Sequence, residues 1–516
     1  MKKVRIICRS SRLSLLQAEL VKQKILSVQP ATEVEIIGRT SRGDRELHLN
    51  LSVLDGTDFF TEEIFDELQK NEADIAVHSL KDMSAQHFFS HHAFAVIDRD
   101  DARDVAIFNP DILKKIREGE TIIVGTCSPR REEMAVEFLK KALPQLHAEI
   151  KIETRSIRGN VEGRLKQLNE RKYDATILAT AGLNRLLRNE TNPATVANPD
   201  SGLISELLKD KLLMLLPLIE CVPAPCQGAI VAEAHPSNEE AVALLQKINH
   251  AELFVDAYNE KKEAYQYGTG CLQKFGVTTL HTSHIKTLYA AGENNQGVKF
   301  SNWSSLPQIN LSDLNIFSST DFMKEFFQYE WSNQLLSIEQ PFVFVANYKA
   351  VQHLSAKDVL QGKKIFASGT RTWYELAKQG YWVDGCADAL GFESFLPVLQ
   401  MPLFQIEQNS ICILTHTEAA GRWYVKGYHA ASNYKLNAVE NKLIVEKISV
   451  ADFIFWSSFS QYKSYGQYCK ATTIHACAGG ETASLLIQEG IEPIIFPTIK
   501  SFDEWRKSSI RQLSVA

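Results

Sequence analysis

Short apolar runs alternate with longer amphipathic stretches along the first 180 residues of the chain. The apolar runs have the length of strands, and the longer stretches carry apolar residues at helical spacing. We therefore predict strands at Val4–Cys8, Glu33–Ile37, Asp74–Val77, Thr121–Val124, Ile150–Glu153 and Ala175–Ala179, and helices at Leu15–Ile25, Glu62–Glu72, Arg131–Leu143 and Val161–Arg171. Regular alternation of strands and helices is typical of α/β domains.

The pattern changes after residue 210 and begins again near residue 308. A turn at Cys226-Gln227-Gly228 leads into a strand, and Ser237–Tyr267 predicts one long helix. The segment Ser301–Asp313 has the composition of a linker. Beyond it, strands followed by small or hydroxyl-bearing residues are predicted at Phe342–Ala346, Lys364–Ala367, Ile411–Leu414, Phe453–Trp456 and Ile474–Cys477. The sequence therefore predicts a second α/β region.

The composition is that of a globular protein with several domains. The chain has 516 residues, of which 45% are hydrophobic and 23% are charged. Its net charge of -6 and its isoelectric point near 6.2 give no reason to expect nucleic-acid binding. Nine cysteines stand singly with no Cys-x-x-Cys pair, which favours neither a disulfide framework nor a zinc site and suits a reducing compartment.

Targeting and membrane signals are missing from the pattern as well. The basic start Met-Lys-Lys-Val-Arg-Ile-Ile leads into a strand without a small-residue cleavage site. No apolar run approaches the roughly 20 residues that span a bilayer. We therefore expect a cytoplasmic protein that has no membrane partner and holds no metal.

The motif His78-Ser79-Leu80-Lys81-Asp82 comes directly after the predicted strand Asp74–Val77. Open α/β sheets bind ligands outside the carboxyl ends of their strands, which is where this motif falls. A carboxylate there can stabilise a developing cation or transfer a proton, and a lysine can hold an anionic group. An isolated Lys-Asp pair is more often a surface ion pair, so the interpretation depends on the neighbouring motifs.

Three strand-to-helix junctions combine hydroxyl residues with arginine: Arg9-Ser10-Ser11, Gly125–Arg131, and Ser156–Asn160 together with Arg164. Arg185 follows another predicted strand. Backbone N–H groups at helix starts and guanidinium groups both bind anions. Neither a P-loop nor a G-x-G-x-x-G motif accompanies them. Because guanidinium matches carboxylate and phosphate alike, the spacing leaves polycarboxylate and polyphosphate ligands open.

Taken in chain order, these motifs resemble hydroxymethylbilane synthase (porphobilinogen deaminase) from about residue 1 to 280. The resemblance implies two α/β domains like those of periplasmic binding proteins, followed by a small α+β cysteine domain. It implies that four porphobilinogen units are joined into hydroxymethylbilane with loss of ammonia, a step of heme biosynthesis. It also implies a covalent dipyrromethane cofactor that serves as a permanent primer.

The resemblance assigns roles by position. It implies that Cys271 holds the dipyrromethane through a thioether, and that Asp82 is the catalytic carboxylate with Lys81 beside it. Each pyrrole unit brings two carboxylates, which favours a polycarboxylate over a polyphosphate ligand. The residues expected to bind these acetates and propionates are Arg9, Ser11, Ser128, Arg130, Arg131, Arg158, Arg164, Arg185 and Gln227.

The chain departs from the family pattern in four places. Thr269 stands in the turn before the cofactor cysteine, where the family usually has glycine, and Lys261 stands where it has arginine. Ser84 replaces the proline that follows the Lys-Asp motif, while Thr57 and Asp58 change a lysine-glycine pair in the flexible loop. These changes bear on the loop and the rate, because the predicted catalytic and cofactor residues are all retained.

The second α/β region resembles uroporphyrinogen-III synthase through its repeated strand–Ser/Thr–helix units. That resemblance implies two α/β domains with a two-stranded connection and a cleft in which the bilane is cyclised. The expected cleft contacts are Thr372, Ser457 and Thr482, although helix capping is the plainer explanation of any single one. Joining producer and consumer in one chain would raise the local concentration of the bilane at the second site.

The predicted division of the chain follows from both resemblances. In the first region it is 1–98 with 196–218, then 99–195, then 219–300 as the cofactor-attachment domain. A linker covers 301–312. The synthase-like region is divided into 313–360 with 450–516, and 361–449.

Two alternatives remain beside this bifunctional interpretation. Two-domain α/β scaffolds with anion-binding helix ends also describe a non-catalytic polycarboxylate-binding protein. In the other alternative the deaminase is active and the C-terminal region is an inactive scaffold. We expect a monomer whose partners are the small molecules porphobilinogen and hydroxymethylbilane, with no nucleic acid.

Overall fold

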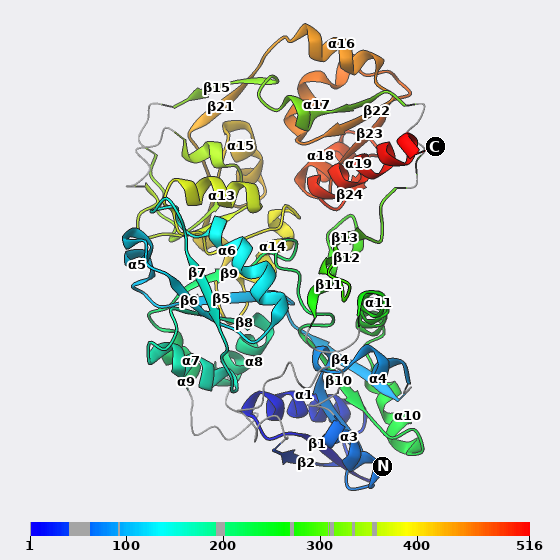
Figure 1. Ribbon diagram of the computed structural model, residues 1–516. Coiled ribbons are helices and arrows are strands. Elements are labelled where there is room, and N and C mark those ends of the chain that lie inside the picture. The colour runs from blue at the N-terminus through cyan, green and yellow to red at the C-terminus, as the bar shows by residue number, and fades with distance from the viewer. Residues whose placement is uncertain are drawn as a thin grey trace. The chain divides into compact units, whose positions relative to one another are not determined.

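The computed structural model describes residues 2–40, 62–90, 93–191, 202–268, 273–307, 309, 314–332, 336–352 and 359–515. The chain forms two compact units (Figure 1). The first unit comprises Met1–Thr279, Leu288–Asn302 and Met401–Phe404, and the second comprises Leu280–Thr287, Trp303–Gln400 and Gln405–Ala516.

The described part of the first unit contains two five-stranded sheets. In each sheet one strand, β10 or β5, runs antiparallel to its neighbours, and the other pairings between described strands are parallel. The first sheet has the order β2 (Glu33–Arg39), β1 (Lys3–Arg9), β3 (Ile75–Ser79), β10 (Ala229–Glu233), β4 (Phe94–Arg99). The second has the order β7 (Ile152–Arg155), β6 (Ile122–Gly125), β8 (Ala175–Ala179), β5 (Asp104–Phe108), β9 (Leu212–Leu215).

Helices follow most of these strands, as the hydrophobic pattern predicts. Their bounds are α1 Arg12–Val28, α3 Glu62–Gln69, α4 Ala85–Ser90, α5 Ile112–Glu118, α6 Val136–Ala142, α7 Val161–Asn169, α8 Thr180–Thr191, α9 Leu203–Leu208, α10 Glu239–Ile248 and α11 Ala251–Tyr267. Two shorter turns matter for the site: the 3-10 turn η2 (Leu80–Asp82) and the π turn η3 (Arg131–Ala135).

The chain crosses between the two sheets twice, and this corrects the predicted domain boundaries. Strand β9 was assigned to the first domain within 196–218, but it pairs with β5 in the second sheet. Strand β10 was assigned to the third domain within 219–300, but it lies in the first sheet between β3 and β4. Both strands are apolar, so only their partners decide where they belong.

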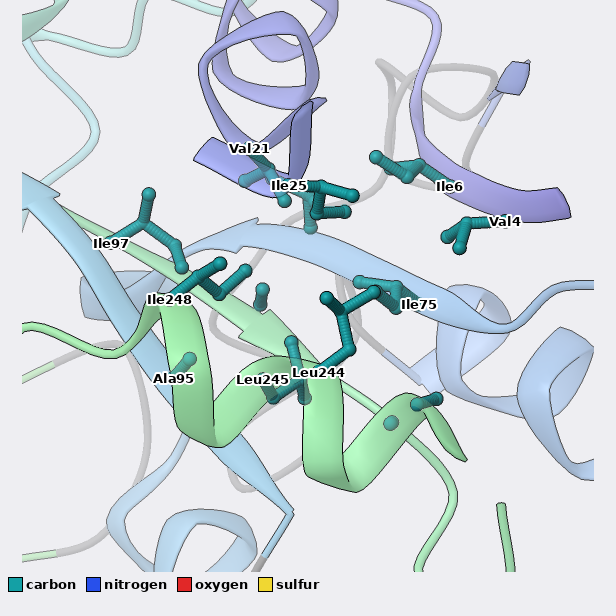
Figure 2. Packing of buried hydrophobic residues seen from close by; sticks show 14 of the residues in the cluster. Val4, Ile6, Val21, Ile25, Ile75, Ala95, Ile97, Leu244, Leu245 and Ile248 are labelled. Carbon is teal, nitrogen blue, oxygen red and sulfur yellow. The ribbon is translucent and has the colours of Figure 1, made fainter. Parts of the chain in front are cut away.

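The hydrophobic core of the first sheet also includes α10, which the predicted division placed in the third domain. Figure 2 shows that helices α1 and α10 contribute side chains to one apolar cluster against the sheet. Each large side chain buried in this way contributes about 1.5–3 kcal/mol. The labelled contributors from the two helices are Val21, Ile25, Leu244, Leu245 and Ile248.

The single helix predicted for Ser237–Tyr267 is wrong, because α10 ends at Ile248 and α11 begins at Ala251. At the break, the side chain of Asn249 accepts a hydrogen bond from the Val96 N–H at 2.9 Å. His250 caps α11 by accepting from the Leu253 N–H at 3.5 Å. The two polar residues thus serve other parts of the backbone, which the apolar periodicity does not reveal.

Gly228 precedes β10 with φ at +88°, and a Cβ at this position would lie 2.3 Å from the carbonyl oxygen of Asp100. We expect Gly228→Ala to lower the free energy of unfolding by about 1–3 kcal/mol through this clash. A further cost of about 1–2 kcal/mol comes from the left-handed backbone. Urea denaturation followed by circular dichroism measures the loss.

Gly202→Ala is the matched control, because Gly202 has a similar φ of +87° and nothing within 4 Å of the added Cβ. It should show the backbone cost alone. Equal losses in the two variants would contradict the steric account of Gly228.

The region predicted to attach the cofactor contains α11 and a small sheet with the order β11 (Lys274–His281), β12 (Lys286–Glu293), β13 (Lys299–Trp303). Apolar residues of α11 and this sheet, among them Ala264 and Phe275, share one core. This arrangement is the small α+β domain that the sequence predicts.

The described part of the second unit contains two parallel sheets and one antiparallel ribbon (Figure 1). The ribbon pairs β15 (Phe327–Trp331) with β21 (Tyr434–Ala438). One sheet has the order β18 (Gly385–Cys386), β17 (Lys364–Ala367), β16 (Phe342–Val345), β19 (Ile411–Thr415), β20 (His429–Ser432). The other has the order β14 (Ile316–Ser318), β22 (Phe453–Trp456), β23 (Ile474–Ala478), β24 (Ile494–Phe496). In chain order, the ribbon strands are the two segments by which the chain passes from one sheet to the other.

The helices of the second unit are α13 Thr370–Lys378, α14 Phe392–Leu399, α15 Thr417–Val425, α16 Lys442–Val450, α17 Phe459–Tyr465, α18 Glu481–Gln488 and α19 Ile499–Val515, with 3-10 turns η5 Ser319–Phe322 and η6 Tyr348–Val351. None of the helices described in either unit has both the length and the hydropathy needed to cross a membrane.

Strand pairing also moves the predicted boundaries of the second unit. Strand β16 was assigned to 313–360 with β14, but it pairs with β17 and β19. Helix α16 was assigned to 361–449 except for its last residue, yet its Ile444 and Ile448 share a core with Phe317 of β14. Each element therefore belongs to the domain opposite to the one predicted.

Candidate functional site

The predicted catalytic pair lies in the 3-10 turn Leu80–Asp82, directly after the buried strand β3. From α1, the side chain of Gln17 donates a hydrogen bond to the Oγ of Ser79 at 3.0 Å. From α11, the ammonium of Lys261 donates to the carbonyl oxygen of Met83. Contacts on both sides thus hold the turn at the carboxyl end of a central strand, where an α/β sheet presents its ligand-binding groups.

Cationic groups from the second sheet lie within electrostatic range of this pair. Burial lowers the pKa of Lys81; Asp82 opposes this effect and Arg131 adds to it. Burial also lowers the pKa of Arg164, to which Arg131 and Arg158 contribute. The structure therefore brings together six predicted site residues: Lys81, Asp82, Arg130, Arg131, Arg158 and Arg164.

Several of these cations lack an acidic partner. Within the described residues, no ion pair joins Lys81, Arg158 or Arg164 to a carboxylate, whereas Arg5, Arg99 and Arg131 each form one. Arg164 instead donates through Nε to the carbonyl oxygen of Gly159 at 2.9 Å. Cations gathered without acids repel one another, so the matching ligand carries several negative charges.

Arg130 and Arg131 are held by a buried carboxylate that the sequence analysis missed. Asp104 accepts from Arg130 at 2.8 Å and from two nitrogens of Arg131 at 2.7 and 3.2 Å. Burial alone would raise the pKa of Asp104, but the two guanidinium groups hold it far below its usual value. The arginines also donate to the carbonyl oxygens of Val222 and Ile177 at 2.7 and 3.0 Å. Ligand binding by these two residues therefore stays a prediction, carried by their remaining N–H groups.

Gln227 lies where the chain crosses between the sheets, Arg185 lies on α8, and both are buried. Gln227 donates to the carbonyl oxygen of Ala102 at 2.6 Å and to Asp104 at 2.8 Å. Arg185 donates to the carbonyl oxygen of Gly228 at 2.6 Å and to a carboxylate of β4 at 3.3 Å. These contacts stabilise the crossing segments, and a role in ligand binding stays a prediction for both residues.

The remaining predicted residues of the first unit lie at carboxyl ends of strands. Arg9 is the last residue of β1, and Ser11 caps α1 by accepting from the Ser14 N–H at 3.3 Å. Ser128 follows β6, and its N–H donates to the Oγ1 of Thr126 at 3.1 Å. These positions suit anion binding by helix starts, as the sequence predicts.

A second buried carboxylate, Glu233, joins β10 to β3 and α4. Glu233 of β10 lies 2.6 Å from the Nε2 of His87 and 3.3 Å from the Nε2 of His78. Burial alone would raise the pKa of Glu233, but the two imidazoles hold it at about 2. Ser84, which departs from the family pattern, accepts from the His87 N–H at 3.0 Å and so positions this histidine. The three side chains come from β3, α4 and β10, and a polar residue within an apolar strand is the one signal the sequence offers.

The glutamate next to Lys261 fixes the cofactor-attachment region. The two terminal guanidinium nitrogens of Arg99 donate to the carboxylate of Glu260 at 2.8 and 3.0 Å. Glu260 also accepts from the Cys226 N–H at 2.7 Å. The backbone N–H of Thr279 also donates a hydrogen bond to the carboxylate of Glu260, at 2.8 Å. Helix α11 is thereby tied to strand β4 and to the turn before β10.

Four residues singled out in the sequence lie outside the described residues. They are the proposed cofactor cysteine and three departures from the family pattern, namely Cys271, Thr57, Asp58 and Thr269.

The three expected cleft contacts of the second unit differ in how far other contacts explain them. Thr372 is buried on α13, with its Oγ1 3.2 Å from the Oγ of Ser368. Ser457 follows β22 and donates to the Oε1 of Gln461 at 2.8 Å, within the capping network of α17. Thr482 lies in the first turn of α18 and is partly exposed. Capping accounts for Ser457, and cleft binding stays a prediction for all three.

Comparisons with known proteins place the first unit. Residues 4–243 match the family model described as porphobilinogen deaminase, dipyrromethane cofactor binding domain. The chain is 33% identical over 298 residues to "Probable porphobilinogen deaminase" of Methanocaldococcus jannaschii, which covers 57% of this chain and 90% of the relative. It is also 33% identical over 278 residues to porphobilinogen deaminase of Chromobacterium violaceum, covering 54% of this chain and 80% of the relative.

A solved periplasmic substrate-binding protein of an ABC transporter from Coxiella burnetii covers 52% of this chain and 99% of its own, with 14% identity and a TM-score of 0.26. These values are too low to support any argument. The identity to the two deaminases extends over most of their length and includes the matched cofactor-binding domain. The chain therefore belongs to the porphobilinogen deaminase family.

Proposed function

We propose that the first unit joins four porphobilinogen molecules into hydroxymethylbilane, with release of ammonia, on a dipyrromethane held by Cys271. The observation that carries this proposal is that Lys81, Arg158 and Arg164 gather near Asp82, and that none of the three forms an ion pair with a carboxylate of the described residues. Each pyrrole unit of primer and substrate brings an acetate and a propionate, which supply the missing negative charges. The donors present therefore fit a dipyrromethane.

In this proposal the acidic residue and the basic residues of the site have different roles. Asp82 stabilises the positive pyrrolic species that develops as ammonia leaves, because a fixed carboxylate is most effective where charge appears in the transition state. Lys81, Arg158 and Arg164 bind the carboxylates and so orient the reacting rings. When bound, the dipyrromethane supplies the primer to which substrate units are added.

The network around Asp104 serves a different purpose. It fixes Arg130 and Arg131 at the start of η3 and α6, so that their remaining N–H groups stay in one place. Preorganised donors lose little freedom when a ligand arrives, which strengthens binding.

We propose that the second unit cyclises hydroxymethylbilane to uroporphyrinogen III. Two parallel α/β sheets connected by the ribbon of β15 and β21 support this proposal, because the resemblance to the synthase implies that architecture. The alternative is a scaffold without activity. Incubating the full chain with fresh hydroxymethylbilane and measuring the isomers formed separates the two, since an inactive scaffold leaves only the type I product of spontaneous closure.

Intact mass spectrometry of the denatured protein tests the deaminase proposal. We expect the wild-type chain to carry an added mass equal to two linked pyrrole units, and the Cys271→Ser variant to have the mass of the bare chain. Cys469→Ser, at a partly buried thiol in the second unit, is the control and should keep the added mass.

A bare-chain mass in wild-type protein that was supplied with porphobilinogen would overturn the proposal. The first unit would then be better described as a polycarboxylate-binding protein.

A further inference from the structure

A cluster of cations lies at one edge of the parallel sheet that contains β16 and β17. The turn η6 follows β16 and helix α13 follows β17, and because these strands are parallel neighbours both segments begin at the same edge. Lys349 lies in η6 and Arg371 in the first turn of α13. This edge is where open α/β sheets bind ligands.

Both cations lie close to tyrosine rings. The Nζ of Lys349 lies 3.5 Å from the ring centroid of Tyr329, on the ribbon strand β15. The Cζ of Arg371 lies 6.0 Å from the ring centroid of Tyr348. The Nη1 of Arg371 lies 2.8 Å from the sulfur of Met323, the residue before Lys324. Residues at the edge of the sheet, in the ribbon and at the end of η5 therefore contribute to one site.

Lys349 is half-buried, and its pKa is lowered to about 8 by burial and by the charges of Arg371 and Lys324. Within the described residues, no ion pair joins any of these three cations to a carboxylate. By contrast, Lys378, which lies on α13 like Arg371, forms an ion pair with Glu375 at 2.7 Å. The cationic cluster, defined as Lys324, Lys349 and Arg371, is thus an uncompensated concentration of positive charge.

A structural role explains only part of this arrangement. The contact between Lys349 and the Tyr329 ring stabilises a cation. It gives no reason for two more cations to lie close by, because like charges raise the free energy of the folded protein. Residues that break a local rule in this way are characteristic of functional sites.

We infer that Lys349 and Arg371, with Lys324, bind a carboxylate group of a linear tetrapyrrole in the second unit. This inference rests on the proposed cyclisation and names the group that the site would recognise. A guanidinium fork binds a carboxylate through two N–H donors, and an ammonium adds a compact charge. The rings of Tyr329 and Tyr348 provide apolar faces beside these donors.

The test uses the full chain and follows type III product as a function of hydroxymethylbilane concentration. Arg371→Gln and Lys349→Gln should each raise KM by about tenfold, the effect of losing one charged hydrogen bond, with a smaller change in kcat. Lys378→Gln, on the exposed face of α13, should leave KM unchanged. Thermal unfolding of all three variants confirms that they are folded.

The pH dependence provides a readout that a structural role would not move. Lysine is charged below its pKa, so the wild-type KM should rise as the pH passes upward through about 8. The groups that face Lys349 are Arg371, Lys324 and the ring of Tyr329. Lys349→Gln should abolish the rise.

The outcomes separate this inference from the proposal on which it rests. If the wild type forms type III product and both variants keep its KM, the inference is wrong and the cyclisation stands. If the wild type forms no type III product, the cyclisation is wrong, and titration with uroporphyrin I decides whether the anion site exists. Loss of one binding site in Arg371→Gln and Lys349→Gln supports the site, and wild-type stoichiometry in both variants overturns it.

Discussion

Asp82→Asn is expected to lower the rate of porphobilinogen consumption by about 10²–10⁴-fold, the range found when a positioned acid or base is removed. The amide has nearly the shape of the carboxylate, so the 3-10 turn after β3 keeps its contacts with α1 and α11. What is lost is the negative charge beside the cations of the site. Ammonia release from porphobilinogen measures the effect directly.

Asp210→Asn is the control, because Asp210 is an exposed carboxylate in the same unit and should keep the wild-type rate. The intact mass of the same samples separates loss of chemistry from loss of the primer. A full rate in Asp82→Asn would exclude the carboxylate from catalysis, whatever the state of the primer.

Asp104→Asn is expected to lower the free energy of unfolding by about 3–5 kcal/mol, because it leaves two buried guanidinium groups without their anion. Gln227 loses a charged acceptor as well. Urea denaturation at pH 7 measures the difference. Asp111→Asn, which breaks an exposed ion pair with Arg171, is the matched control and should cost less than about 1 kcal/mol.

The pH dependence of this difference has a definite sign. The pKa of Asp104 is lowered in the folded protein, so its contribution is complete above the unfolded value of about 3.9. It is lost as the pH falls below that value toward the folded pKa. The gap between wild type and Asp104→Asn should therefore stay constant from about pH 5 to 8 and shrink in acid. A gap below about 1 kcal/mol at pH 7 would show that the arginines find other partners.

Strands and helices were largely predictable because their signals are local. The strand Ala175–Ala179 occurs with the predicted bounds. The strand predicted at Val4–Cys8 extends one residue further at each end in the structure. Pairing was less predictable, because β9, β10 and β16 are apolar strands whose residues carry no mark of the sheet that receives them. Their positions depend on contacts between distant parts of the chain.

In the candidate site, too, the motifs could be predicted from the sequence, but the residues that contact them could not. The positions of Asp82, Lys81 and the arginines follow from motifs at strand ends, and the structure brings most of them together. That Asp104 would hold two of the arginines could not be predicted, because its role depends on the antiparallel placement of β5. Likewise, the strand Lys364–Ala367 that precedes Arg371 was predicted, but the proximity of Arg371 to Lys349 depends on the parallel pairing of β16 and β17.

Strand β10 has a consequence for how the protein is synthesised. Among the described strands, β4 has β10 as its only partner in the sheet, and β10 leaves the ribosome after every strand of the second sheet. Until then the nascent chain exposes open edges at β3 and β4, which are templates for aggregation. A chain that stops before residue 229 cannot close its first sheet, so the N-terminal domain completes its fold only after its neighbour has been made.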